Sequence, residues 1–344
     1  MAEPDAAALE TPRTTFDLVG HDAAQALVLD ALNSGHMPHA WLITGPRGVG
    51  KATLAFRIAR FLLAHGSSDG AGAAPQTLAV DPDHPAVRRI SAGSHADLLV
   101  LERPFLNERG TETADLNIFQ VRRIAPFLHM TSAEGAWRVV IIDEADALNT
   151  NSANAILKIV EEPPNRVVVL LLADRPGGLL PTIRSRCRRL TLNPLSQDAL
   201  AAHLLATGQI SRPDQADALA GLAGGCIGRA LSLQAGGGVE LHARITGMLD
   251  GASAPDWSGI HGLADTLAAK GADDRFALAV EMITDALADR ARSCALEGQA
   301  DGLERWVAVW EKTRDVFAGA VAANLDRRQV ILQVFGEIRA ASRG

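Results

Sequence analysis

Residues Gly45-Pro-Arg-Gly-Val-Gly-Lys-Ala52 decide the fold, because their glycine spacing and their lysine match a phosphate-binding loop, or P-loop. In such a loop backbone N–H groups surround the phosphates, and the lysine, here Lys51, reaches the outer ones. The pattern then requires Ser or Thr to hold Mg²⁺, but Ala52 has no side-chain oxygen. Thr53 points its hydroxyl elsewhere, since one helical step is a rotation of about 100°. We expect this loop to hold a nucleotide and to hydrolyse it poorly.

The segments beside the loop are those that a P-loop requires. Residues 40–44 form a short apolar run that predicts a buried strand. Residues 52–63 carry apolar side chains at helical spacing. Strand, glycine-rich loop and helix follow in the required order, which favours a P-loop over an ordinary Gly-rich turn.

Composition is that of a globular protein, with 344 residues, 47% hydrophobic and 21% charged. The net charge of −7 provides no global basic field, so contact with DNA requires a local patch or a partner. Cys187, Cys226 and Cys294 lie far apart without a CxxC motif, which argues against a disulfide framework and a cysteine zinc site. No apolar run reaches membrane-spanning length and the N-terminus is acidic, so we expect a cytoplasmic protein.

Strand-like and helical segments alternate from Phe16 to about Leu192, and continuous apolar strands predict a parallel sheet buried on both faces. The expected strands are residues 40–44, 97–101, 138–142, 167–172 and 188–192. Later helices are expected to include residues 278–287 and 306–317. The predicted domains are a flexible tail at 1–15, an α/β domain at 16–195, a small helical domain at 196–238 and a larger helical domain at 239–344. Residues 66–76 are of low complexity and predict a mobile loop.

An acidic pair, Asp143 and Glu144, follows the apolar run at residues 139–142. In a P-loop protein the first acid of such a pair aids Mg²⁺ binding, and the second orients or deprotonates the attacking water. Alone, two acids after a strand usually form a solvated turn. Their place downstream of a P-loop reverses that preference, so we expect both to lie beside Lys51.

Residues 181–189, Pro-Thr-Ile-Arg-Ser-Arg-Cys-Arg-Arg, place four arginines around Cys187 in an otherwise acidic chain. Guanidinium groups at a domain edge suit a phosphate or carboxylate of another molecule. The alternative is a basic rim that pairs with the acidic end of the helix predicted at 151–162, which the following prolines stop. The residue chemistry alone favours neither.

Four motifs occur in one order: the P-loop, Asp-Glu-Ala-Asp at 143–146, Asn-Ala-Ile-Leu-Lys-Ile-Val-Glu-Glu-Pro-Pro at 154–164 and Ser-Arg-Cys at 185–187. Together they resemble the bacterial clamp-loader branch of the AAA+ family, over about residues 16–236. The resemblance implies an α/β P-loop AAA+ domain, in which helices flank a parallel sheet, followed by a small helical lid and an all-α C-terminal collar. It also implies a ligand, ATP or ADP, with Mg²⁺ weakly held.

The resemblance assigns a role to each motif residue. Arg186 is implied to be an arginine finger, which completes the ATP site of a neighbouring motor subunit, with Ser185 and Cys187 packing around it. Cys187 as a nucleophile is the alternative, but the sequence suggests no histidine partner for it. The residues expected at the chain's own nucleotide site are Gly45, Gly48, Gly50, Lys51, Ala52, Thr53, Asp143 and Glu144.

Three positions depart from the pattern of a motor subunit. Besides Ala52, Asp174 stands where a polar sensor is expected, and its charge repels a phosphate. In residues 225–231, Gly228 occupies the place of the sensor arginine and Arg229 follows one helical step later.

Many relatives also carry a four-cysteine zinc module, whereas residues 64–96 contain histidines but no cysteine. We predict no zinc.

Two functions remain in view. The first is a non-motor subunit, in a ring with motor subunits of the gamma/tau type and a delta subunit, that helps to load a sliding clamp onto primer–template DNA. It donates Arg186 and has weak or no hydrolysis of its own. The alternative is an ATP-hydrolysing AAA+ motor, either the loader's motor subunit or a DNA-remodelling ATPase. The missing magnesium ligand and the altered sensors favour the first.

Overall fold

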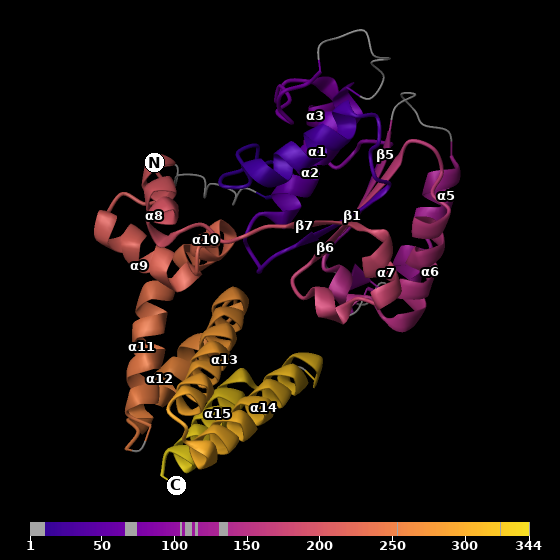
Figure 1. The fold of residues 1–344 in the computed structure, drawn as a ribbon. Helices are drawn as coiled ribbons and strands as arrows, with labels where there is room; N and C mark the ends of the chain where they lie inside the picture. The colour runs from indigo at the N-terminus through magenta and orange to yellow at the C-terminus, as the bar shows by residue number, and fades with distance from the viewer. Residues whose placement is uncertain are drawn as a thin grey trace. The chain divides into compact units, whose positions relative to one another are not determined.

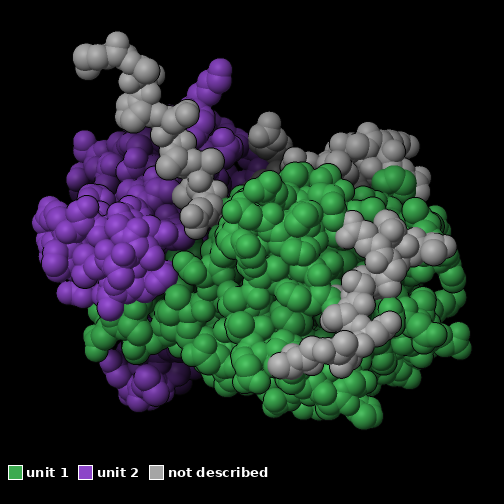
Figure 2. All heavy atoms as spheres, turned by 90° about the horizontal axis from the view of Figure 1, so that it is seen from above, with its two compact units in different colours: residues 1–200, 224–229 green, residues 201–223, 230–344 purple. Residues whose placement is uncertain are grey.

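The computed structural model describes residues 11–65, 74–103, 105–106, 112–113, 116–130, 137–252, 254–323 and 325–343. Residues 1–10 of the predicted tail and 66–73 of the predicted loop lie outside the described residues. The chain divides into two compact units, residues 1–200 with 224–229 and residues 201–223 with 230–344 (Figure 2). The domain limits expected at 195/196 and 238/239 stay predictions.

The first unit is built on a sheet of five parallel strands in the order β2-β5-β6-β1-β7 (Figure 1). They are β1 (Ala40–Thr44), β2 (Leu98–Leu101), β5 (Arg138–Ile142), β6 (Val167–Ala173) and β7 (Arg188–Thr191). These are the strands expected from the apolar runs, so the predicted parallel sheet is confirmed. The expected burial on both faces does not hold for β7, in which only Leu190 is buried. A short antiparallel pair, β3 (Phe105–Leu106) and β4 (Glu112–Thr113), was not expected.

Helices cover both faces of the sheet, and every residue of β1, β5 and β6 is buried. Consecutive strand residues point to opposite faces, so Leu170 packs in one apolar core and Leu171 in the other. The first core includes α1 (Asp22–Asn33), α2 (Lys51–His65) and α3 (Pro85–Ser91). The second includes α4 (Ile118–Val121), α5 (Ile124–His129), α6 (Thr150–Glu161) and α7 (Pro181–Arg186). Figure 1 shows these groups on either side of the sheet.

Local chemistry sets the limits of α6 and α7. α6 starts after Asn149, whose side chain accepts a hydrogen bond from the N–H of Ser152 at 3.0 Å, as an N-cap does. It ends at Glu161, just before Pro163 and Pro164, because proline lacks the donor that a helix needs. α7 starts with Pro181, whose fixed φ suits a first helical position.

A buried arginine holds residues 11–16 against α2. Arg60, 2% exposed, donates hydrogen bonds from Nη2 to the carbonyl oxygens of Pro12, Arg13 and Thr15. Its guanidinium lies 4.5 Å from the ring centre of Phe16. Burial lowers the pKa of Arg60 to about 10, which leaves it charged at neutral pH. The described part of the predicted tail is therefore anchored to the domain.

After β7 the regular structure of the described chain is helical. The helices are α8 (Gln197–Ala206), α9 (Pro213–Ala223), α10 (Ile227–Ala235), α11 (Gly238–Asp250), α12 (Trp257–Ala268), α13 (Asp273–Leu296), α14 (Ala300–Ala323) and α15 (Arg327–Ser342). α13 and α14 contain the two helices expected at 278–287 and 306–317, and Phe276 and Phe317 join them edge to face, with ring centres 6.2 Å apart. Within the described residues, no helix has both the length and the apolar character needed to span a membrane.

Candidate functional site

The carboxyl ends of three adjacent strands carry the candidate site. β1 leads into the P-loop, β5 into Asp143 and Glu144, and β6 into Asp174. Parallel strands end at the same edge of a sheet, which is where open α/β sheets bind ligands. The strand order β5-β6-β1 therefore gathers residues that are about 130 positions apart in sequence.

The P-loop has a backbone conformation that glycine adopts readily and other residues do not. Gly48 has a φ of +77° and Gly50 a φ of +112°. A Cβ added to Gly48 would lie 2.6 Å from the backbone nitrogen of Arg229, too close for any real side chain. His21, which the sequence did not single out, supports the loop from another side, with its Nε2 2.8 Å from the carbonyl oxygen of Val49.

Lys51 is satisfied within the chain. Its Nζ donates to the carbonyl oxygens of Gly45 at 2.8 Å and Pro46 at 2.9 Å, and lies 2.5 Å from Asp174 Oδ1. A lysine ammonium has three N–H donors, so these contacts use them all. The side chain is only 8% exposed, which makes internal partners necessary. Asp174 is thus the carboxylate partner of the lysine that, in a nucleotide-bound P-loop, reaches the phosphates.

Asp143 and Glu144, the acidic pair, also have partners within the chain. Asp143 Oδ1 accepts a hydrogen bond from the N–H of Glu144 at 2.9 Å, and burial raises the pKa of Asp143. Glu144 has a left-handed φ of +50° and forms an ion pair with Arg103. Arg103 was not predicted from the sequence, because it is a lone arginine just after β2 with no motif around it.

The donor set does not fit Mg²⁺ well. Ala52 and Thr53 form the start of α2, and Ala52 offers no oxygen where the ion would need a hydroxyl. Asp143 holds its proton more tightly than an ordinary carboxyl group, and the carboxylate of Glu144 is paired with Arg103. Among the residues that the structure describes, no cluster of His, Cys, Asp and Glu could hold a metal ion. We therefore derive no hydrolytic step at this site.

Gly228 meets the P-loop directly. Its N–H donates to the carbonyl oxygen of Gly48 at 2.9 Å, and a Cβ on Gly228 would lie 3.0 Å from the Cα of Gly48. The first turn of α10 therefore rests on the tip of the loop. In the sequence, Gly228 stands at the place expected for a sensor arginine. The structure shows that this place has little space for a side chain. Cys226, next to this turn, is buried in the first core.

Arg186 lies at the end of α7, away from the residues above. Its Nη1 donates to the carbonyl oxygen of Thr182 at 3.1 Å, and its Nη2 lies 2.9 Å from Glu161 Oε1. This pairing is the one that the alternative of a basic rim and an acidic helix end predicts. Ser185 donates to the Thr182 carbonyl at 3.0 Å.

Cys187 is buried in the second core, and burial raises its pKa to about 11, which argues against a nucleophilic role.

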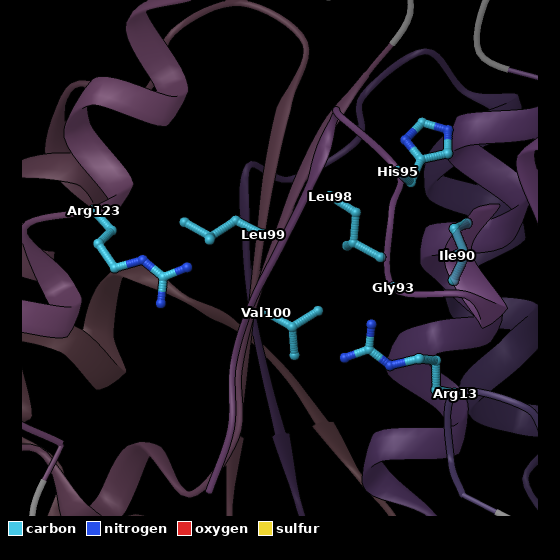
Figure 3. A pocket seen from close by; sticks show the side chains of 8 residues that line it. All are labelled: Arg13, Ile90, Gly93, His95, Leu98, Leu99, Val100 and Arg123. Atoms are coloured by element: carbon cyan, nitrogen blue, oxygen red, sulfur yellow. The ribbon is translucent and has the colours of Figure 1, made fainter. Parts of the chain in front are cut away.

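A separate cavity of about 160 Å³ opens beside β2, the strand at one edge of the sheet. Figure 3 shows Arg13 and Arg123 on opposite sides of this strand, with Leu99 on the side of Arg123. Arg13 pairs with Glu102 at 2.5 Å. None of the lining residues belongs to the P-loop or to the acidic pair, so this cavity is not part of the candidate site.

Comparison with known proteins identifies the family of this chain. A family model described as DNA polymerase III, delta subunit, matches residues 20–196, just over half of the chain. The subunit delta' of DNA polymerase III from Pseudomonas aeruginosa is 35% identical over 210 residues, covering 60% of this chain and 59% of that protein. The subunit tau from Salmonella typhimurium is 29% identical over 307 residues, covering 87% of this chain and 42% of that protein. The chain thus spans less than two thirds of either relative's length.

A solved structure is similar over most of the chain. It is a DNA polymerase III gamma subunit-related protein from Thermotoga maritima, 16% identical, with a TM-score of 0.40. The similarity covers 92% of this chain and 100% of the Thermotoga chain.

Replacing Gly48 by alanine should lower the free energy of unfolding by about 1–3 kcal/mol more than replacing Gly35 by alanine. Both glycines have a positive φ, but a Cβ on Gly35 would meet nothing within 4 Å, whereas one on Gly48 would press on the first turn of α10. Chemical denaturation of the two variants measures the difference. Equal losses would mean that the loop tip has room to move.

Asp174→Asn should tighten ATP binding to the isolated full chain by about five- to tenfold, because it removes the carboxylate that competes with phosphate for Lys51. Isothermal titration calorimetry measures the affinity. Adding Lys51→Ala to Asp174→Asn should abolish the gain. An unchanged affinity in Asp174→Asn would show that Asp174 does not limit binding.

Cys187 should react with iodoacetamide much more slowly than the partly exposed Cys294 at pH 8. With a pKa of about 11, only about 0.1% of the Cys187 thiol is thiolate at that pH. Its rate should rise about tenfold per pH unit until the pH approaches that pKa. Mass spectrometry of digested samples gives both rates, and fast labelling of Cys187 at pH 8 would contradict its burial.

Proposed function

The chain belongs to the DNA polymerase III delta subunit family, and we propose that it acts as a delta-prime-like subunit of a clamp loader. In that role it helps to place a sliding clamp on primed DNA during replication. Its partners would be motor subunits of the gamma/tau type and a delta subunit, with clamp and DNA reached through the complex. It would belong to the polymerase III holoenzyme in the cytoplasm without performing polymerase chemistry itself.

The observation that carries this proposal is the ion pair between Lys51 and Asp174. A motor subunit needs its P-loop lysine for the phosphates of ATP. Here the ammonium has all its donors engaged by two carbonyl oxygens and a carboxylate 2.5 Å away. With Ala52 in place of the magnesium ligand, the chain's own site is suited at most to weak nucleotide binding.

Arg186 supplies the second half of the proposal. It lies at the end of α7 with 41% of its side chain exposed, so another subunit can reach it. A guanidinium fork binds phosphate oxygens in two places and carries a permanent charge. We propose that it acts in trans as an arginine finger, stabilising the charge that builds on a neighbour's ATP during phosphoryl transfer.

The alternative is an ATP-hydrolysing motor of the gamma/tau type. One observation favours this alternative. Lys51, Asp143 and Glu144 all lie at the carboxyl edge of the sheet, where a motor needs them. Against it stand the contacts that already engage each of these side chains. A loader rebuilt with single variants of this chain separates the two functions.

Arg186→Ala should reduce clamp- and DNA-dependent ATP turnover of the rebuilt loader, because removing an arginine finger lowers the rate at the affected site by about 10³–10⁵-fold. The total turnover falls by the share of that one site. Lys51→Ala should change turnover by less than about twofold, since Lys51 has no role in the neighbour's site. A reversed result, with Lys51→Ala damaging and Arg186→Ala silent, would identify this chain as a motor.

A further inference from the structure

The guanidinium of Arg186 is fixed at two points on rigid elements. One is the carbonyl oxygen of Thr182, one turn earlier in α7, and the other is the carboxylate of Glu161, the last residue of α6. Both helices are anchored in the second core, α6 through Ile156 and Val160 and α7 through Ile183. The carboxylate therefore comes from a second helix of the same packed core.

We propose that Glu161 is a positioning residue, which orders the Arg186 side chain so that it can meet a phosphate on a neighbouring subunit. This inference rests on the proposed role of Arg186. An arginine side chain has many rotamers, and holding it in one before the neighbour arrives removes an entropic cost from the catalytic step.

By donor count, Arg186 has N–H groups left for a phosphate while it keeps its contact with Glu161. A guanidinium has five N–H donors. The contacts to Thr182 and Glu161 use one donor each, which leaves three for a phosphate. If Glu161 instead competed with the phosphate for Arg186, its carboxylate would have to leave the guanidinium before the phosphate could bind.

The solvent exposure of the Arg186–Glu161 ion pair determines how much the loss of Glu161 should change the rate. The side chains of Arg186 and Glu161 are 41% and 44% exposed, so water screens their attraction. Exposed pairs of this kind change an equilibrium by about two- to fivefold. The loss of Glu161 should therefore weaken the finger without disabling it, in contrast to the loss of Arg186.

The neighbouring Glu162 offers a matched control. It carries the same charge at the same helix end and is exposed. Within the described residues it forms no ion pair with Arg186, whose carboxylate partner is Glu161. Glu162→Ala therefore reproduces the change in net charge without removing the contact.

The test uses the rebuilt loader with clamp and primed DNA. Glu161→Ala should lower the rate at the neighbour's site about two- to fivefold, so that the total kcat for ATP falls by less than in Arg186→Ala, with KM nearly unchanged, because an arginine finger acts in the transition state. Glu161→Gln keeps an oxygen acceptor and should restore most of the rate, and Glu162→Ala should match the wild type. In an Arg186→Ala background, adding Glu161→Ala should have no further effect, since the two residues act as one unit.

Four results would overturn the inference. Equal rates for Glu161→Ala and Glu162→Ala would show that the contact does not matter, and a faster Glu161→Ala loader would show that the carboxylate competes with phosphate. An additive loss in the double variant would mean that Glu161 acts on overall structure. If Arg186→Ala itself is silent, the proposed function fails and the inference fails with it. A loss confined to Arg186→Ala leaves the proposed function standing and rejects only the role of Glu161.

Discussion

The buried ammonium of Lys51 is the interaction on which the carboxyl edge of the sheet depends. A charge that is 8% exposed must find partners inside the protein. The order β5-β6-β1 places Asp174 within reach, at 2.5 Å, and the loop bends its own carbonyl oxygens of Gly45 and Pro46 toward the same atom. The lysine that a motor uses for phosphate is here used to join the loop to the neighbouring strand.

A second constraint acts on the opposite side of the same loop. Gly48 and Gly228 come so close that neither has free space for a Cβ, and the N–H of Gly228 bonds to the Gly48 carbonyl. In a motor subunit the place of Gly228 belongs to an arginine that reaches the nucleotide, as the clamp-loader resemblance implies. A glycine there lets the backbone of Gly228 and Arg229 approach the loop closely.

In the proposed function, the chemistry of this chain therefore lies at the exposed Arg186 more than at its own P-loop. Glu144 is paired with Arg103 and Ala52 offers no metal ligand, while Arg186 remains accessible at the end of α7. The two sequence-based interpretations of the arginine cluster are compatible. The pair with Glu161 is the predicted basic rim on an acidic helix end, and the same guanidinium retains three donors for a second molecule.

The five parallel strands, the P-loop and the helix that ends before Pro163 were predicted from the sequence, because apolar runs, glycine spacing and proline act over a few neighbouring residues. The acidic residue Asp174 at the place expected for a polar sensor, and the absent hydroxyl at Ala52, were also visible in the sequence. Only the tertiary structure decided which charges meet. Lys51 with Asp174, Glu144 with Arg103, and Arg186 with Glu161 join residues from different elements, and His21 and Gly228 contact the loop from segments far away in sequence. Such pairings depend on strand order and helix packing, which no local pattern in the chain contains.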